Sequence, residues 1–167
     1  SAAENSGTAT ITVLRSGGSQ GALTVQVGVT NGTAISPADF TGGTNTLVWA
    51  AGETTSKTFT VPLVDNLNVD GNRTVNLRLF NASVPGALGT VTNAVLTIVD
   101  DDAFGKLAFS QPAYTVNENG SQAVITVVRL AGVAGTVSVR YDTVSGGTAI
   151  AGSNYVAAGG TLTLVPG

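Results

Sequence analysis

The sequence predicts an all-β protein whose strands pair antiparallel in a sandwich, and three observations support that prediction. Thr and Val favour strands and supply over a quarter of the chain, with 24 Thr and 23 Val. Apolar residues alternate with polar ones at 23–29, 59–63 and 75–79, which is the pattern of half-buried strands. Turn-forming residues separate these segments, and no segment has helical length and period. Many short strands joined by turns are typical of antiparallel sandwiches.

Alternation and turn signals together place the strands along the chain. The first series of expected strands covers 8–15, 22–30, 46–50, 55–64, 73–80 and 89–99. The second series covers 107–110, 113–117, 122–130, 135–144 and 161–165. Trp49 alternates with Leu47 inside one of these strands, so we expect it in the core rather than as a platform for a sugar.

Composition excludes several classes of function. The chain has no Cys and no His, which excludes disulfides, zinc or haem sites, thiol nucleophiles and His-based catalysis. A net charge of −3 argues against a nucleic-acid partner, and no apolar stretch is long enough for a membrane span. Gly-rich stretches precede strands rather than helices, which argues against a phosphate cradle. We therefore expect a protein that is not an enzyme.

The chain contains an internal repeat. Glu4-Asn5 recurs as Glu118-Asn119, and Arg15 recurs as Arg129, in each case 114 residues later. After one inserted residue, Gly32-Thr33-Ala34 recurs as Gly147-Thr148-Ala149. A period of this length is too long for a solenoid repeat and fits tandem sandwich domains.

The repeat sets the expected domain boundaries. Residues 1–102 form a sandwich that lacks its first strand pair, residues 103–106 form a linker, and residues 107–167 form the first half of a second sandwich. Half a sandwich exposes unpaired strand edges and an uncovered apolar face. We expect either a fragment of a longer array or a chain whose missing strands are supplied by neighbouring chains.

Acidic residues are rare, and most of them fall at one predicted end of the first copy. If each strand reverses direction, seven of its eight acidic residues follow the same ends of the strands, and only Glu53 lies at the opposite end. Such clustering is costly unless a cation neutralises it. Oxygen ligands on loops suit calcium best and magnesium second, whereas an isolated Asp is explained as well by turn formation. The predicted ligands are Glu4, Asp39, Asp65, Asp70, Asp100, Asp101 and Asp102.

The order of these motifs resembles the Calx-beta domain family. The pattern consists of Glu4-Asn5, a strand ending in Arg15, Gly32-Thr33-Ala34, Asp39-Phe40, Leu47 to Gly52-Glu53, an acidic loop at 65–73 and Asp100-Asp101-Asp102. Much of it recurs in the second copy, which has Asn154-Tyr155 in place of Asp39-Phe40. Each motif is weak alone, but the ordered and repeated set is specific.

The resemblance implies an immunoglobulin-like Greek-key sandwich that binds Ca²⁺ at one end, between domains. Such domains serve as cytoplasmic calcium sensors in sodium–calcium exchangers and as tandem arrays in bacterial surface proteins. Two positions depart from the family's calcium-binding pattern: Asn66 replaces an Asp, and Arg73 replaces a Glu. Arg73 could place its own cation among the carboxylates, so we expect fewer ions than the best-equipped members bind.

The leading functional prediction is a non-enzymatic calcium-binding structural module. We expect it in an array of neighbouring repeats in an extracellular or cell-surface bacterial protein with an adhesion or filament-like role. Calcium would stiffen the joint between domains. The alternatives are a calcium-responsive regulatory domain and a polymer subunit that self-assembles by strand exchange through exposed edges.

Overall fold

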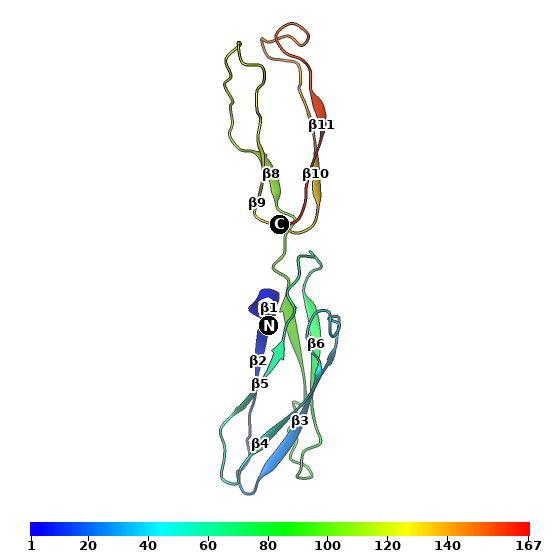
Figure 1. The fold of residues 1–167 in the computed structure, drawn as a ribbon. Helices are drawn as coiled ribbons and strands as arrows, with labels where there is room; N and C mark the ends of the chain where they lie inside the picture. The colour runs from blue at the N-terminus through cyan, green and yellow to red at the C-terminus, as the bar shows by residue number, and fades with distance from the viewer. The chain divides into compact units, whose positions relative to one another are not determined.

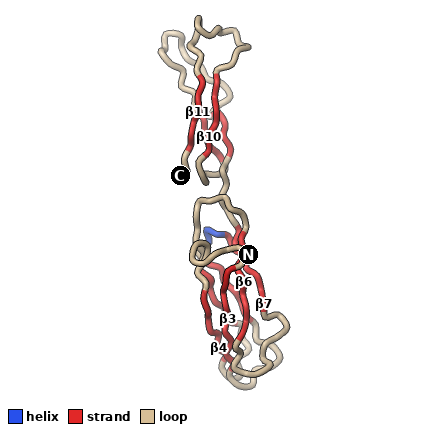
Figure 2. Tube along the Cα trace, turned by 90° about the vertical axis from the view of Figure 1, so that its right-hand side faces the viewer, coloured by secondary structure: helices blue, strands red, loops and turns tan.

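The computed structural model describes residues 1–167 and contains eleven β-strands, one short 3₁₀ helix and no α-helix (Figures 1 and 2). The chain divides into two compact units, the first made of Ser1–Asn66 with Asp70–Asp101 and the second of Leu67–Val69 with Asp102–Gly167. The predicted all-β sandwich class is confirmed.

The first unit is a sandwich of two sheets. The larger sheet has the strand order β1–β7–β6–β3–β4, and the smaller sheet pairs β2 with β5. All pairs are antiparallel except that of β1 with β7, which is parallel. The strands are β1 (Ala2–Ala3), β2 (Thr8–Val13), β3 (Leu23–Asn31), β4 (Gly43–Trp49), β5 (Lys57–Pro62), β6 (Arg73–Phe80) and β7 (Asn93–Val99), and η1 (Glu4–Ser6) follows β1.

The core lies between these two sheets. Alternating residues of each strand point inward, so that in β3 Val25, Val27 and Val29 are buried. Trp49 is 1% exposed, as predicted, and its indole Nε1 donates to the Thr55 carbonyl oxygen at 2.7 Å. Of the sixteen buried apolar residues in the chain, fifteen belong to this core.

The second unit consists of two separate antiparallel pairs. Strands β8 (Lys106–Phe109) and β9 (Val127–Leu130) form one pair, and β10 (Val137–Asp142) and β11 (Gly159–Leu164) form the other. Ala134 is the one apolar residue of this unit that is fully buried. The apolar side chains that alternate along these strands are partly buried or exposed.

One predicted strand of the second copy is absent, and another is shorter than predicted. Residues 113–117 and the first part of the predicted strand 122–130 are irregular, and only Val127–Leu130 pairs. In the first copy the equivalent segments pair with β7 and β5, respectively. The equivalents of β7 and β5 do not lie within residues 107–167, so these segments have no partner to complete a ladder.

Candidate metal centre

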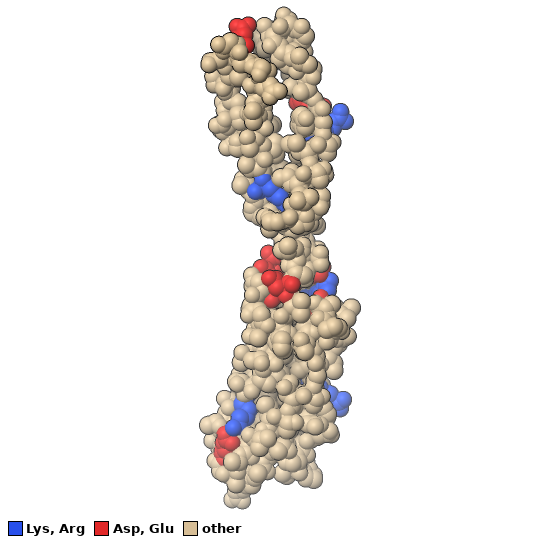
Figure 3. All heavy atoms as spheres, in the orientation of Figure 1, with Lys and Arg blue, Asp and Glu red and all other residues tan.

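The strand reversals of the first unit bring four segments that are distant in sequence to one end. These segments are η1, the loop between β3 and β4, the loop between β5 and β6, and the residues that follow β7. Figure 3 shows acidic and basic side chains gathered at this end of the unit. We call this set, made of Glu4, Asp39, Asp65, Asp70, Arg73, Asp100 and Asp101, the acidic end.

Arg73 is the cation of the acidic end and joins two of its carboxylates. Its guanidinium donates to Asp39 Oδ1 at 2.7 Å and pairs with Asp70 Oδ2 at 2.6 Å. The hydrogen bond to Asp39 raises the pKa of Arg73 against the opposing effect of burial, and the charges of Asp39, Asp70 and Glu4 add to the increase. The guanidinium therefore occupies the position of a counter-ion between two loops.

Asp39 is held on both sides of its carboxylate. The side chain is buried, and its second oxygen, Oδ2, accepts the Ile35 backbone N–H at 2.7 Å. This contact closes the loop between β3 and β4 on itself, which is the ordinary turn-forming use of an Asp. The carboxylate thus has both a structural partner and a charged partner.

Glu4 is the second buried acid, 6% exposed. Its Oε1 accepts the backbone N–H of Asn66 at 2.9 Å and also the Asn66 side-chain amide. Burial of a carboxylate is costly without such donors, so Asn66 stabilises Glu4 in its present position. The sequence pattern identified Asn66 only as a missing acid, and did not reveal it as the partner of Glu4.

The residues after β7 contact the neighbouring segments. Asp100 Oδ2 accepts the backbone N–H groups of Asp70 at 2.9 Å and Gly71 at 2.6 Å. Asp101 Oδ2 accepts the side-chain amide of Asn5 at 2.5 Å. Asn5 was part of the repeat motif, but the motif alone did not predict this contact.

The two remaining predicted ligands are placed differently. Asp65 is exposed and forms no ion pair. Asp102 belongs to the second compact unit, and its role as a ligand stays a prediction.

The acidic end has the donor chemistry for a hard cation but not a preformed ligand shell. All of its potential ligand atoms are carboxylate or amide oxygens, which calcium prefers. No three acidic side chains converge closely enough to hold one ion. Arg73 pairs with Asp39 and Asp70, and backbone amides donate to Asp100. The residues therefore fit calcium chemically, provided that Arg73 releases its carboxylates.

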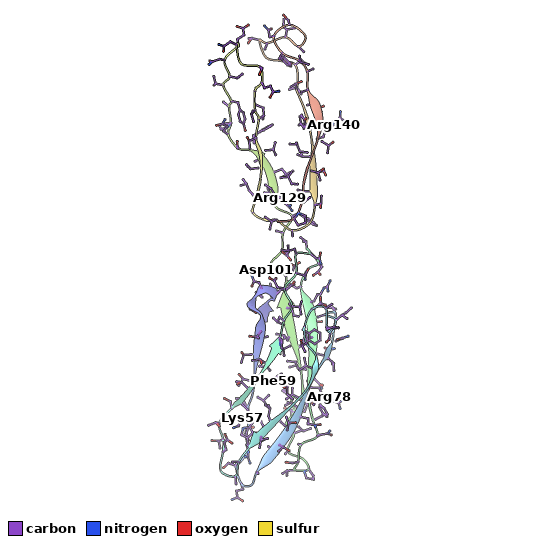
Figure 4. All side chains as sticks on the ribbon, in the orientation of Figure 1. Lys57, Phe59, Arg78, Asp101, Arg129 and Arg140 are labelled. Carbon is purple, nitrogen blue, oxygen red and sulfur yellow. The ribbon has the colours of Figure 1, made fainter.

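Glu53 lies at the opposite end of the unit, in the turn before β5. It pairs with Lys57 at 2.5 Å and accepts from the Ala50 backbone and the Thr55 hydroxyl. The hydrogen bond from Lys57, followed by those from Ala50 and Thr55, lowers the pKa of Glu53 to about 2. Figure 4 places Lys57 and Asp101 far apart along the first unit, so this pair is independent of the acidic end.

The repeated arginines have a structural function that the sequence did not reveal. The Arg15 guanidinium donates to the carbonyl oxygens of Gly21 at 3.0 Å and Ala50 at 3.2 Å. Arg129 donates to Gly135 at 3.0 Å and Val165 at 3.4 Å, the equivalent positions of the second copy. The recurrence of an Arg at the end of a strand in both copies is the sequence signal that could have indicated this shared bonding to backbone carbonyls.

The second copy reproduces one local feature of the acidic end. Asn154, the equivalent of Asp39, accepts the Ile150 backbone N–H with its Oδ1 at 2.9 Å. The turn is therefore preserved while the charge is lost. The equivalents of Arg73 and of the acidic loops do not lie within residues 107–167, so no ligand set is assigned to the second copy.

Comparison with known proteins gives one consistent family. The Calx-beta domain model matches residues 1–102 and 100–167. Sodium/calcium exchanger Calx of Drosophila melanogaster is 30% identical over 159 residues, and sodium/calcium exchanger 1 of Felis catus is 29% identical over 161. These alignments cover 95% and 86% of this chain but only 16% of each exchanger.

Solved structures agree with the sequence matches. The calcium binding domain CBD12 of CALX1.1 is similar with a TM-score of 0.62 and 27% identity, over 98% of this chain and 66% of that one. The apo form of the Calx CBD1 domain is similar with a TM-score of 0.57 and 28% identity, over 60% of this chain and 88% of that one. The fold is therefore the immunoglobulin-like sandwich of these calcium-binding domains. The chain belongs to the Calx-beta domain family and carries two neighbouring copies of the domain.

The same matches correct one prediction. An extracellular or cell-surface bacterial location was expected, but the relatives are animal sodium/calcium exchangers, the family members in which this domain is intracellular. The matched exchangers likewise give no support to an adhesion or filament-like role. The prediction failed because composition and the lack of cysteine are compatible with either compartment. The structure contains no helix with the length and apolar character needed to cross a membrane.

Proposed function

We propose that this chain is a non-catalytic calcium-responsive module and that the acidic end of its first copy binds the ion. The observation that carries the proposal is the charge imbalance at this end. Six carboxylates, those of Glu4, Asp39, Asp65, Asp70, Asp100 and Asp101, belong to this end, and Arg73, the one basic residue of the set, pairs with two of them, Asp39 and Asp70. Five negative charges remain in excess, and a divalent cation would relieve their repulsion. The similarity to calcium-binding domains supports calcium as that cation.

Asp39 and Asp70 are the central ligands in this proposal because they belong to different loops and already share one cation. Calcium would compete with Arg73 for them, and Glu4, Asp65, Asp100 and Asp101 would supply further oxygens. Calcium contributes a concentrated positive charge and six to eight oxygen bonds, which one guanidinium does not provide. Competition by Arg73 lowers the expected number of ions and their affinity.

The response to calcium follows from the segments that carry these ligands. Asp100 and Asp101 directly follow β7 and precede Asp102 and the residues that lead to the second copy. An ion bound there would fix the start of that connecting segment. The similarity to sodium/calcium exchangers favours a regulatory use of this change. The tandem repeat favours a second candidate function, in which calcium stiffens successive copies of an array.

Calcium titration by calorimetry, together with thermal melting of the whole chain in calcium and in chelator, tests the proposal. We expect heat of binding and a higher melting temperature in calcium. The substitution Asp39→Asn is suited to the test because Asn154 shows that Asn preserves the turn. We expect this variant to remain folded and to lose most of the calcium effect, as should the Asp100→Asn, Asp101→Asn double variant.

Asp142→Asn is the matched control, because Asp142 is a carboxylate of the second unit that pairs only with exposed Arg140. This variant should respond to calcium as the parent does. A melting temperature that is the same in calcium and chelator, with no heat of binding, would contradict the proposal. A full calcium effect in the Asp100 and Asp101 double variant would place the site elsewhere.

A further inference from the structure

The larger sheet of the first unit ends in a strand whose outer side is free. Strand β4 is the last strand of that sheet and pairs only with β3, and Figure 2 shows β3, β6 and β7 following it across the sheet. Thr44, Thr46 and Val48 are exposed on the face of β4 that points away from the core. An edge strand presents a row of free backbone N–H and C=O groups, to which another strand can add.

Strand β4 lacks the features that usually protect an edge strand from pairing. Natural edges are commonly guarded by charged side chains, proline, bulges or a covering loop. The seven residues of β4 include no charged residue and no proline, and their register with β3 is continuous from Gly43 to Trp49. The edge is therefore long, regular and uncharged.

The edge of β5 in the smaller sheet has the protection that β4 lacks. This strand begins with the charged Lys57 and ends with Pro62. The loop after β3 also covers its end, because the Thr41 backbone N–H donates to the Pro62 carbonyl oxygen at 2.9 Å and Phe40 forms a bridge with Leu63. The same unit thus has one guarded edge at β5 and one unguarded edge at β4.

The exposed side chains of β4 are complementary to those of a second β4. Residues directly opposite each other in an antiparallel pair point to the same face and interact. When two β4 strands pair about Thr46, this residue lies opposite Thr46 of the second chain, and Thr44 lies opposite Val48 on both sides of the axis. Each of these pairs joins two β-branched residues, which favour strands. The uncharged edge also lets two chains meet although each carries a net charge of −3.

We propose that β4 is a self-association edge, at which the β4 strands of two chains pair antiparallel around a twofold axis beside Thr46. The two five-stranded sheets then form one continuous sheet, and both chains contribute the same residues. No strand leaves its own sheet, so this association differs from the strand exchange considered for the incomplete copy. One strand pair forms an interface below the roughly 1,200 Å² of stable complexes, so the dimer is weak and depends on concentration.

Charge substitution at Thr46 tests the proposal, with sedimentation of the whole chain over a range of concentrations as the measurement. Chelator is present throughout, so that calcium does not bridge the acidic ends of two chains. We expect the parent to form dimers as its concentration rises. Thr46→Lys and Thr46→Glu each place like charges opposite each other and should weaken the dimer about tenfold. An equimolar mixture of the two variants places opposite charges across the axis and should restore the dimer.

Thr30→Lys is the matched control for the charged variants. Thr30 is also an exposed Thr of the larger sheet, but its strand β3 has neighbours on both sides. The substitution changes the net charge as Thr46→Lys does, and it should leave the dimer unchanged. Circular dichroism verifies that all variants keep the strands of the parent. Equal weakening of the dimer by Thr30→Lys and Thr46→Lys would overturn the proposal.

Cross-linking tests the position of the twofold axis. The chain has no Cys, so Thr46→Cys adds a single thiol, and Thr30→Cys adds one away from the edge. A short bis-maleimide should link two Thr46→Cys chains much faster than two Thr30→Cys chains, because the residues beside the axis lie directly opposite each other. Equal rates of cross-linking, a mixture of charged variants that stays monomeric, or a parent that is monomeric at its highest soluble concentration would each overturn the proposal.

Discussion

The two copies of the repeat share local structure and differ in burial. The hairpin β3–β4 pairs Leu23 with Trp49 and Val25 with Leu47, and the hairpin β10–β11 pairs Val137 with Leu164 and Val139 with Leu162. These are the same repeat positions in the same register. In the first copy Val27 is 1% exposed, whereas its counterpart Tyr141 is 41% exposed.

The difference shows which level of structure each part of the sequence encodes. Alternation and turn residues are sufficient to set the register of a hairpin, so the register persists in an incomplete copy. Burial depends on two complete facing sheets, whereas the second unit contains only one strand pair of each, β8–β9 and β10–β11. The buried core of the first copy therefore depends on β5, β6 and β7, whose equivalents do not lie within residues 107–167.

Substitution of equivalent core residues should produce the largest contrast between the copies. Phe40 is fully buried, whereas its counterpart Tyr155 is only partly buried. We expect Phe40→Ala to reduce the free energy of unfolding of the first copy by about 3–5 kcal/mol and Tyr155→Ala to change it by less than about 1 kcal/mol. Urea unfolding followed by far-ultraviolet circular dichroism, which reports the strands of both copies, measures both. Equal losses would mean that the second copy has a core absent from this structure.

Equivalent glycines provide a second test of the comparison. A Cβ at Gly32 would lie 2.5 Å from the Thr74 carbonyl oxygen on β6, while a Cβ at Gly147 meets nothing within 4 Å. Gly32→Ala should therefore destabilise the chain by about 1–3 kcal/mol through overpacking. Gly147→Ala should be neutral or stabilising by about 0.4–1 kcal/mol. Thermal melting of the two variants and the parent measures both effects. Equal shifts of the melting temperature in the two variants would contradict this prediction.

These glycines also show what could be predicted from the sequence. The repeat identified both glycines. Gly32 is required because Thr74 on β6 lies close to it, and no local sequence pattern reveals that contact. The sandwich, the copies and most strands follow from alternation and turns. The prediction of a strand at 113–117 was wrong because the equivalent of β7, with which it would pair, does not lie within residues 107–167. The contacts of Asn5 with Asp101, of Asn66 with Glu4 and of Arg15 with Ala50 were missed because they join segments far apart in sequence.

Removal of Arg73, the cation of the acidic end, should change the stability of the chain and its response to calcium. Arg73→Met leaves Asp39 and Asp70 without their ion pair, so we expect a lower melting temperature in chelator and a larger stabilisation by calcium than in the parent. Arg78→Met is the matched control, because Arg78 lies on the same strand, is exposed and forms no ion pair (Figure 4). Equal effects of the two substitutions would show that Arg73 does not compete with calcium.

The smallest effect is expected at the opposite end, where Glu53 pairs with Lys57. The pKa of Glu53 is about 2 in the folded chain and 4.5 without its partners. The pair therefore stabilises the fold fully above about pH 4.5, and this contribution disappears as the pH falls through about 2. Glu53→Gln should lower the melting temperature slightly at pH 6 and not at all near pH 2. The partial exposure of both side chains keeps the difference small, since water and salt screen such pairs. Melting curves of parent and variant that stay equally far apart from pH 6 to pH 2 would show that Glu53 acts through its uncharged contacts instead.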